Sequence, residues 1–282
     1  MPKVKLELES RPESLILVRG MLAAVAELLD FDAELLHNLK TVVSEACNNV
    51  VLHAYDGEAG RLAVDLEIGP DEVEAVVRDW GCGICQITPS EDRINVGLAV
   101  ISALADRAQF VRVPEGGTEV RMAFTDRSGI RSLERRSGTR TDEQVAVELA
   151  GDAIATLSPG LLAGVLARVA TALAARARFS LDRFCDVYLV ADAVAAHAEP
   201  AAIDERLSFA ITARDRRLEL TVGPFRAGSG AAFRSEEGLG RLGSALTLLS
   251  VELAVEPVSE AEVWRLVVLD GNGASLATAA LR

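Results

Sequence analysis

The feature that most constrains the fold of this chain is a twofold repetition in the order of its hydrophobic patterns. In the first 125 residues, alternating apolar and polar residues predict strands, and apolar residues spaced three and four apart predict helices. The expected elements are strand 4–9, helices 12–30 and 32–55, strands 61–69 and 72–80, helix 96–107, and strands 108–114 and 117–125. Asp32 is a plausible N-terminal cap for the second helix. The strands from 61 onward are expected to form two hairpins.

The second half of the chain presents the same order about 145 residues later. Helices are expected over 158–179 and 180–200, a hairpin over 206–225, a glycine-led helix with its strand over 239–257, and a strand over 260–270. Residues 126–157 between the halves are expected to be a linker, because 126–143 are polar and mixed in charge. We interpret the pattern as two tandem α+β domains, 1–125 and 158–282. The alternative is that successive helices and hairpins resemble each other by chance.

Composition limits the classes of function. The net charge of −13 and the pI near 4.8 argue against a general nucleic-acid binder, which needs Lys and Arg to neutralise phosphates. The charge suits a basic protein partner or simply a solvated acidic surface. The start MPKVKLELES lacks the apolar core of a signal peptide, and no membrane span is expected. Four cysteines do not suggest a disulfide framework, so a cytoplasmic, reduced protein is expected.

The stretch RDWGCGIC, residues 78–85, fits two chemistries. Cys82 and Cys85 form a CxxC, the spacing of redox sites and of half a zinc site, whereas Asp79-Trp80-Gly81-Cys82-Gly83 is a DxGxG turn. A redox cysteine pair favours a helix N-terminus, which flanking glycines oppose. A structural zinc site needs four ligands, and the remaining cysteines form no second pair. The DxGxG interpretation, a turn that lets a nucleotide approach the backbone, is therefore favoured.

The second helix carries a carboxylate and an amide on one face. Glu45 and Asn49 lie four residues apart, about one turn of a helix. Such a pair suits an oxygen-ligated Mg²⁺, with one group holding the ion and the other orienting or deprotonating a nucleophile. The alternative for Glu45 is a solvated helix charge, which its apolar neighbours make less favourable.

Three spaced motifs resemble a known family. VVSEACNNVVLHAY, VRDWGCGI and GGTEVRM, in this order, are similar to the GHKL ATPase superfamily, and most similar to its branch of anti-sigma factor serine kinases. The resemblance covers nearly all of residues 1–125. It implies a two-layer α/β sandwich of the Bergerat type, which binds ATP between its helices and a mixed sheet.

The resemblance implies roles at the phosphate end of the nucleotide. Asn49 would coordinate the Mg²⁺ that bridges the ATP phosphates, and Glu45 would be the general base for a serine or for water. Arg93 would reach the γ-phosphate. Gly97 would open a helix whose N-terminal amides face the phosphates.

The resemblance also implies roles at the adenine end. Asp79 would accept a hydrogen bond from the adenine amino group, assisted by the Thr118 hydroxyl. Gly81 and Gly83 would let the backbone turn against the base.

This sequence departs from the branch in two places. Asn95 stands where the branch has a glycine, giving N-V-G-L in place of GxGL, and Asn tolerates the left-handed backbone better than most residues. The lid, about residues 84–95, is shorter than is usual for these kinases. ATP binding is therefore expected more firmly than efficient phosphoryl transfer.

The second half is expected to keep the fold without an ATP site. Aligned at His197, Leu189 stands in the place of Glu45, Ala193 in that of Asn49, and Pro224 at or beside that of Asp79. The position of Thr118 falls at about Ala261. This degenerate copy would supply a dimer partner within one chain or a docking surface.

The expected function is that of an ATP-binding regulator of transcription. It would bind Mg·ATP and phosphorylate a serine of a STAS-type anti-anti-sigma partner. Sequestration of a sigma factor through protein contacts is a further expected activity. The alternative is an ATP-responsive binding module without phosphoryl transfer. No direct contact with nucleic acid or membrane is expected, and a homodimer or an intrachain pseudo-dimer is. A histidine kinase is disfavoured, because no dimerisation helix presenting a phosphoacceptor histidine precedes the ATP domain.

Overall fold

The computed structural model describes residues 1–82, 92–114, 116–126, 129–130, 149–234 and 251–270. The chain divides into two compact units. The first comprises Met1–Arg135 with Ala155–Leu157, and the second comprises Arg136–Ile154 with Ser158–Arg282.

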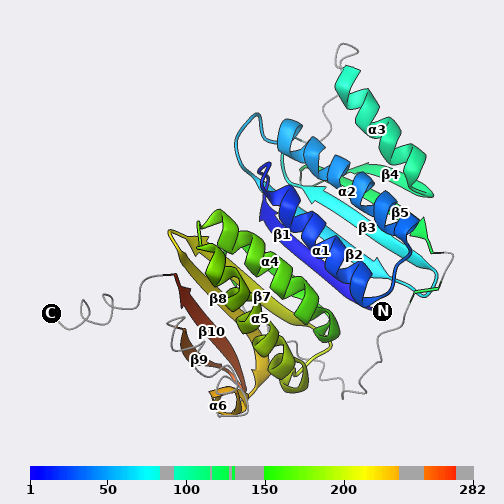
Figure 1. The fold of residues 1–282 in the computed structure, drawn as a ribbon. Coiled ribbons are helices and arrows are strands. Elements are labelled where there is room, and N and C mark those ends of the chain that lie inside the picture. The colour runs from blue at the N-terminus through cyan, green and yellow to red at the C-terminus, as the bar shows by residue number, and fades with distance from the viewer. Residues whose placement is uncertain (83–91, 115, 127–128, 131–148, 235–250, 271–282) are drawn as a thin grey trace. The chain divides into compact units, whose positions relative to one another are not determined.

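The first unit consists of a sheet with two helices on one face (Figure 1). Its strands follow the order β4-β5-β3-β2-β1. The elements are β1 (Lys3–Glu9), α1 (Ser14–Leu28), α2 (Ala33–His53), β2 (Arg61–Ile68), β3 (Glu72–Asp79), α3 (Asp92–Leu104), β4 (Arg107–Arg112) and β5 (Thr118–Thr125). The α+β class and both hairpins are confirmed. The expectation of a mixed sheet is wrong for this unit, since every strand pair in this order is antiparallel; two of the pairs, β2–β3 and β4–β5, are hairpins.

Local sequence explains how β1 and α2 form. Alternate residues of β1, such as Leu6, are buried, as its period of two predicts. Asp32 caps α2 as expected, and its carboxylate accepts a hydrogen bond from Leu35 N at 2.6 Å. An apolar stripe on α2 then faces the core: Leu35, Leu39, Val42, Val43, Ala46, Cys47 and Val50. Burial of this stripe stabilises the helix more than propensity does.

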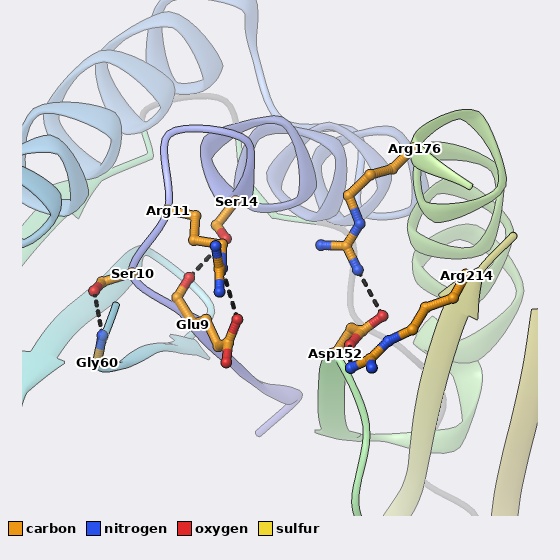
Figure 2. Close-up of polar contacts among 8 residues, drawn as sticks. All are labelled: Glu9, Ser10, Arg11, Ser14, Gly60, Asp152, Arg176 and Arg214. Atoms are coloured by element: carbon orange, nitrogen blue, oxygen red, sulfur yellow. Dashed lines mark hydrogen bonds and ion pairs between the residues drawn. The ribbon is translucent and has the colours of Figure 1, made fainter. Parts of the chain in front are cut away.

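The turn from β1 into α1 is fixed by side-chain hydrogen bonds (Figure 2). Ser14 Oγ donates to Glu9 O at 2.7 Å, and the side chains of Arg11 and Glu9 form an ion pair. Ser10 Oγ accepts a hydrogen bond from Gly60 N at 2.8 Å. The residue that precedes β2 is thereby attached to the end of β1.

Helix α3 begins earlier than expected. It runs from Asp92 to Leu104, so Gly97 lies inside the helix and does not open it. The stretch 92–96 contains neither proline nor glycine, so nothing in it opposes an earlier helical start. The role expected for Gly97 as the first helical residue is therefore wrong.

The second unit repeats the layer arrangement, with two helices on one face of a sheet (Figure 1). The strand order is β9-β10-β8-β7-β6, which matches β4-β5-β3-β2-β1 element by element. From residue 153 onward the elements are β6 (Ala153–Leu157), η1 (Pro159–Leu161), α4 (Leu162–Arg176), α5 (Leu181–Ala201), β7 (Leu207–Arg214), β8 (Arg217–Arg226), α6 (Ser229–Arg234), β9 (Glu252–Val258) and β10 (Ala261–Leu269). The boundary between the units divides β6, because Ala153 and Ile154 belong to the second unit and Ala155–Leu157 to the first.

Two elements of the second half were not expected. Strand β6 lies in the segment interpreted as a linker, where its five residues alternate between buried and half-buried. Helix α6 is too short to show a helical period. The helix expected within 239–250 lies outside the described residues, as does most of the expected linker.

Asp152 links β6 to β7 and α4 in the second unit (Figure 2). Its carboxylate accepts hydrogen bonds from Ala213 N at 3.0 Å and from Arg176 Nη2 at 2.6 Å. Arg214 lies at 3.5 Å from the other oxygen. One carboxylate thus joins a helix and two neighbouring strands.

One described helix is long and apolar enough to cross a membrane, by length and composition alone. It spans Pro159–Arg176, and half of it is buried. Within the second unit its residues from Leu162 onward form α4, which packs against α5 and β7. This packing favours a core helix over a membrane span.

Candidate functional site

Glu45 and Asn49 lie together on the half-buried face of α2, as their spacing predicted. Helix α3 packs on this face at Gly97. A Cβ atom at Gly97 would lie 2.4 Å from Glu45 Oε1 and 3.4 Å from Asn49 Nδ2. The structure therefore brings these three residues together, and a side chain at residue 97 would displace the end of the Glu45 side chain. Cys47, on the opposite side of α2, is buried, and burial raises the pKa of its thiol to about 12.

Asp79 ends β3 as a buried carboxylate with an exposed fraction of 3%. Its Oδ1 accepts a hydrogen bond from Gly81 N at 2.9 Å, and its Oδ2 accepts one from Thr118 N at 3.2 Å. Thr118 itself is 4% exposed and begins β5. Two backbone amides thus fix the carboxylate, and Asp79, Gly81 and Thr118 are brought together as expected.

Burial raises the pKa of Asp79 above its ordinary value, although the amides of Gly81 and Thr118 act in the opposite direction. A desolvated carboxylate is costly unless donors surround it. Each oxygen of a carboxylate has two lone pairs, so each can accept one more hydrogen bond. Asp79 is therefore ready to accept a further N–H donor from a ligand.

Gly81 and Gly117, which both adjoin Asp79, lie so close to other backbone atoms that neither position has space for a side chain. A Cβ atom at Gly81 would lie 1.9 Å from Ala54 O, and one at Gly117 would lie 2.1 Å from Asp79 O. Gly117 also has a φ of +87°, which disfavours any other residue. The sequence interpretation assigned no role to Gly117, although the paired glycines of GGTEVRM were the signal for it.

The remaining expected site features lie partly outside the described residues. Gly83, the Arg93 side chain and the lid expected over 84–95 belong to that group.

Among the described cysteines, Cys47, Cys82 and Cys185 form no disulfide. No group of three or more His, Cys, Asp or Glu residues suited to a metal ion occurs in the described part of the chain. Oxygen ligation by Asn49 and ligand phosphates needs no such group.

The second unit has different residues at the equivalent places. Leu189 is 40% exposed on α5, and Pro224 lies in β8 after a cis peptide bond with Gly223. Opposite β8, Glu262 is buried at the start of β10, next to a register shift between Glu262 and Trp264. No carboxylate–amide pair like Glu45 and Asn49 stands at residues 189 and 193.

An aromatic cluster fills this end of the second unit. The rings of Phe233 and Trp264 stack with centroids 4.6 Å apart, and Phe225 lies 4.1 Å from Trp264. His197, which sequence alignment pairs with His53, packs on Phe233 at 5.2 Å. Such packing leaves each ring in contact with others rather than with a ligand.

Glu262 holds helix α6 against this cluster. Its carboxylate accepts hydrogen bonds from Gly228 N at 2.8 Å, Ser229 Oγ at 3.0 Å and Trp264 Nε1 at 3.0 Å, and also from Gly230 N. Burial alone would raise the pKa of this carboxyl, but the donors outweigh it and hold the pKa below its ordinary value. The second unit thus satisfies the Glu262 carboxylate internally.

Comparisons with known proteins identify the family of the first unit. The model of the family described as histidine kinase-like ATPase domain matches residues 8–124. The anti-sigma F factor of Oceanobacillus iheyensis is 30% identical over 131 residues, 43% of this chain and 90% of that protein. That of Pasteuria penetrans is 31% identical over 132 residues, 43% of this chain and 88% of that protein. The serine-protein kinase RsbW of Bacillus pumilus is 37% identical over 81 residues, 28% of this chain and 50% of that protein.

A solved structure titled "Structure of crystal form III of TP0453" covers 96% of this chain and 90% of its own. Its TM-score of 0.33 and identity of 10% are too low to carry an argument.

The fold of the first unit is that of a histidine kinase-like ATPase domain. The chain belongs to this GHKL family, in the branch of anti-sigma factors and serine-protein kinases.

Proposed function

We propose that the first unit binds ATP with Mg²⁺ and that the chain is a regulatory serine/threonine protein kinase of the anti-sigma type. One observation carries the proposal. Asp79 is a buried carboxylate, fixed by two backbone amides and flanked by glycines at 81 and 117. A carboxylate so placed accepts an amino group such as that of adenine. The glycines let neighbouring backbone, at Ala54 and at Asp79 itself, pack closely against this turn and hold it in place.

The phosphate end of the site is proposed to lie at Glu45 and Asn49. Asn49 would hold Mg²⁺, which neutralises charge on the phosphates. Glu45 would accept the proton of a serine hydroxyl as that oxygen forms its bond to the γ-phosphorus and the bond to the leaving ADP breaks. Arg93 would stabilise the charge on the transferred group, and residues 92–97 would contribute backbone donors.

The partners are proposed from the names of relatives. Anti-sigma F factors and a serine-protein kinase match the first unit, so a sigma factor and a STAS-type substrate protein are the proposed partners. A cytoplasmic location follows from such partners.

The second candidate function is nucleotide-responsive capture of a partner without phosphoryl transfer. The contact of Gly97 with Glu45 favours it, because a base covered by α3 cannot reach a serine until α3 moves.

The second unit is proposed to be a degenerate copy that binds no nucleotide. The matching strand orders of the two units support the duplication. The Phe233–Trp264 stack and the internally bound Glu262 support the loss of the ligand site. The unit would then serve as an intrachain dimer partner or as a docking surface.

Calorimetry with ATP tests the proposal directly. Wild type should bind ATP at micromolar concentration only with Mg²⁺. Asn49→Ala should weaken binding at least about tenfold, or about 1.4 kcal/mol. Asn48→Ala, which removes the neighbouring amide of α2, is the matched control and should bind as wild type does. Absence of ATP binding by wild type would overturn the proposal.

A further inference from the structure

The C-terminal end of α2 holds the turn that contains Asp79. Cys82 N donates a hydrogen bond to Ala54 O at 2.9 Å, and Trp80 N donates one to Tyr55 Oη at 2.9 Å. The same helix carries Asn49 and Glu45 about one to three turns earlier. A single helix therefore contacts both ends of the proposed nucleotide site.

The Tyr55 hydroxyl bridges two strands. It accepts from Trp80 N, just after β3, and donates to Arg61 O, the first residue of β2. Burial raises the pKa of the Tyr55 phenol, and the Asp79 carboxylate adds to this shift. The phenol thus keeps its proton at neutral pH, which the donated hydrogen bond requires.

The Tyr55 ring is also fixed by packing. A Cβ atom at Gly60 would lie 2.2 Å from Tyr55 Cε1, so the ring lies flush against the backbone of Gly60. Gly60 is in turn tied to Ser10 by Ser10 N donating to Gly60 O at 2.7 Å and by Gly60 N donating to Ser10 Oγ at 2.8 Å. The hydroxyl is consequently presented from a rigid support.

Two successive backbone amides of this turn, those of Trp80 and Gly81, are each held by a side chain. Its amide is bound by Tyr55, while the next amide, Gly81 N, is bound by Asp79 Oδ1 at 2.9 Å. If the Trp80 amide moved, Gly81 N would move with it. The Asp79 carboxylate, which accepts a hydrogen bond from Gly81 N, would then rotate. The orientation of Asp79 therefore depends on a hydrogen bond that Asp79 does not itself make.

We propose that Tyr55 is a positioning residue that sets the base specificity of the nucleotide site by holding the Asp79–Gly81 turn. The inference rests on the proposed function, in which Asp79 accepts the adenine amino group. Inosine triphosphate carries a carbonyl oxygen in place of that amino group, so a fixed Asp79 rejects it. Loss of the Tyr55 hydroxyl lets the carboxylate turn away and reduces the discrimination.

The test measures the dissociation constants of Mg·ATP and Mg·inosine triphosphate for wild type and Tyr55→Phe. Wild type should prefer ATP by at least about tenfold, since a site built to accept a hydrogen bond discriminates against a ligand that lacks the donor. Tyr55→Phe should bind ATP more weakly, bind inosine triphosphate unchanged, and lose most of the preference. Tyr188→Phe is the matched control, because Tyr188 is the only other tyrosine and is 55% exposed on α5 of the second unit. It should keep the wild-type ratio.

The outcomes separate the possible failures. If Tyr55→Phe weakens the affinity for both nucleotides equally, Tyr55 has a structural role only. If both affinities stay at the wild-type values, Tyr55 has no role at the site. Either result overturns this inference but not the proposed function. A wild type that binds both nucleotides equally well would also overturn it. Absence of any ATP binding overturns the proposed function as well. Amide hydrogen exchange of wild type adds a measurement that does not depend on folding of the variant: Trp80 N–H should be protected, and rapid exchange there would contradict the bond.

Discussion

The backbone of Gly97 faces the carboxylate of Glu45 so closely that a Cβ atom would lie 2.4 Å from Glu45 Oε1. The atom in the way is the end of a flexible side chain, so Gly97→Ala displaces Glu45 without unfolding α3. Alanine favours a helix interior by about 1 kcal/mol over glycine. Gly97→Ala should therefore melt within a few degrees of wild type and still bind ATP, while ATP turnover falls at least about tenfold from misplacement of the base. Ser102→Ala, at an exposed position of α3, is the control. Unchanged turnover would contradict this role of the contact.

Glu45→Gln separates binding from chemistry. The amide has the shape of the carboxylate but cannot accept a proton, so turnover should fall by about 10²–10⁴-fold. ATP affinity measured by calorimetry should stay within about threefold of wild type, because Asn49 and Asp79 remain. A parallel loss of affinity and turnover would indicate that Glu45 binds the ligand rather than acting as base.

Gly117→Ala should be much more damaging than Gly57→Ala. Both glycines have a φ of +87°, so both variants carry the same backbone strain of about 1 kcal/mol. Only Gly117 faces another backbone atom, with Asp79 O at 2.1 Å from the position of a Cβ; Gly57 has nothing within 4 Å. Denaturant unfolding should show about 2 kcal/mol or more of additional loss for Gly117→Ala, together with loss of ATP binding. Equal losses would mean that the contact is unimportant.

The stability of the second unit should fall in acid because of Glu262. Its folded pKa is lower than its ordinary value of 4.5, so its stabilising effect is present above that value and is lost as the pH falls through the folded pKa. Glu262→Gln should cost about 1–3 kcal/mol at pH 7, because donors lose an acceptor. Denaturant unfolding between pH 7 and pH 3 should show this difference shrinking. Glu256→Gln, at an exposed position of β9, should behave as wild type. A difference that is constant with pH would contradict the assignment.

The two tryptophans report separately on the two units. Trp80 directly follows Asp79, whereas Trp264 is fully buried in the aromatic cluster. In Trp264→Phe, ATP should change the emission of the remaining Trp80. In Trp80→Phe, ATP should leave the emission of Trp264 unchanged, because the second unit is proposed to bind no nucleotide. A response of Trp264 to ATP would show that nucleotide binding reaches the second unit.

The sequence predicted those parts of the site that depend on local spacing. The cap at Asp32 and the shared face of Glu45 and Asn49 follow from helical geometry alone. The place of Asp79 at the end of β3 followed from the strand pattern and the glycines after it.

Features set by contacts between distant segments could not be predicted. Gly97 was expected to open a helix because the family resemblance implies it, but the helix begins at Asp92 and Gly97 lies against the side chain of Glu45. Glu262 went unnoticed because alignment placed Ala261 opposite Thr118, and a register shift in β10 is invisible without its partner strand. Tyr55 belonged to a quoted motif, yet its role depends on Trp80, which lies 25 residues away.

Helix α2 contacts both the Glu45–Asn49 pair and, through Ala54 and Tyr55, the turn at Asp79. A helix rises about 1.5 Å per residue and hardly stretches, so α2 fixes the distance between the Glu45–Asn49 pair and the turn at Asp79. In the proposed site, a nucleoside would therefore contact only the Asp79 end of α2, and a free triphosphate would contact only the Glu45–Asn49 end.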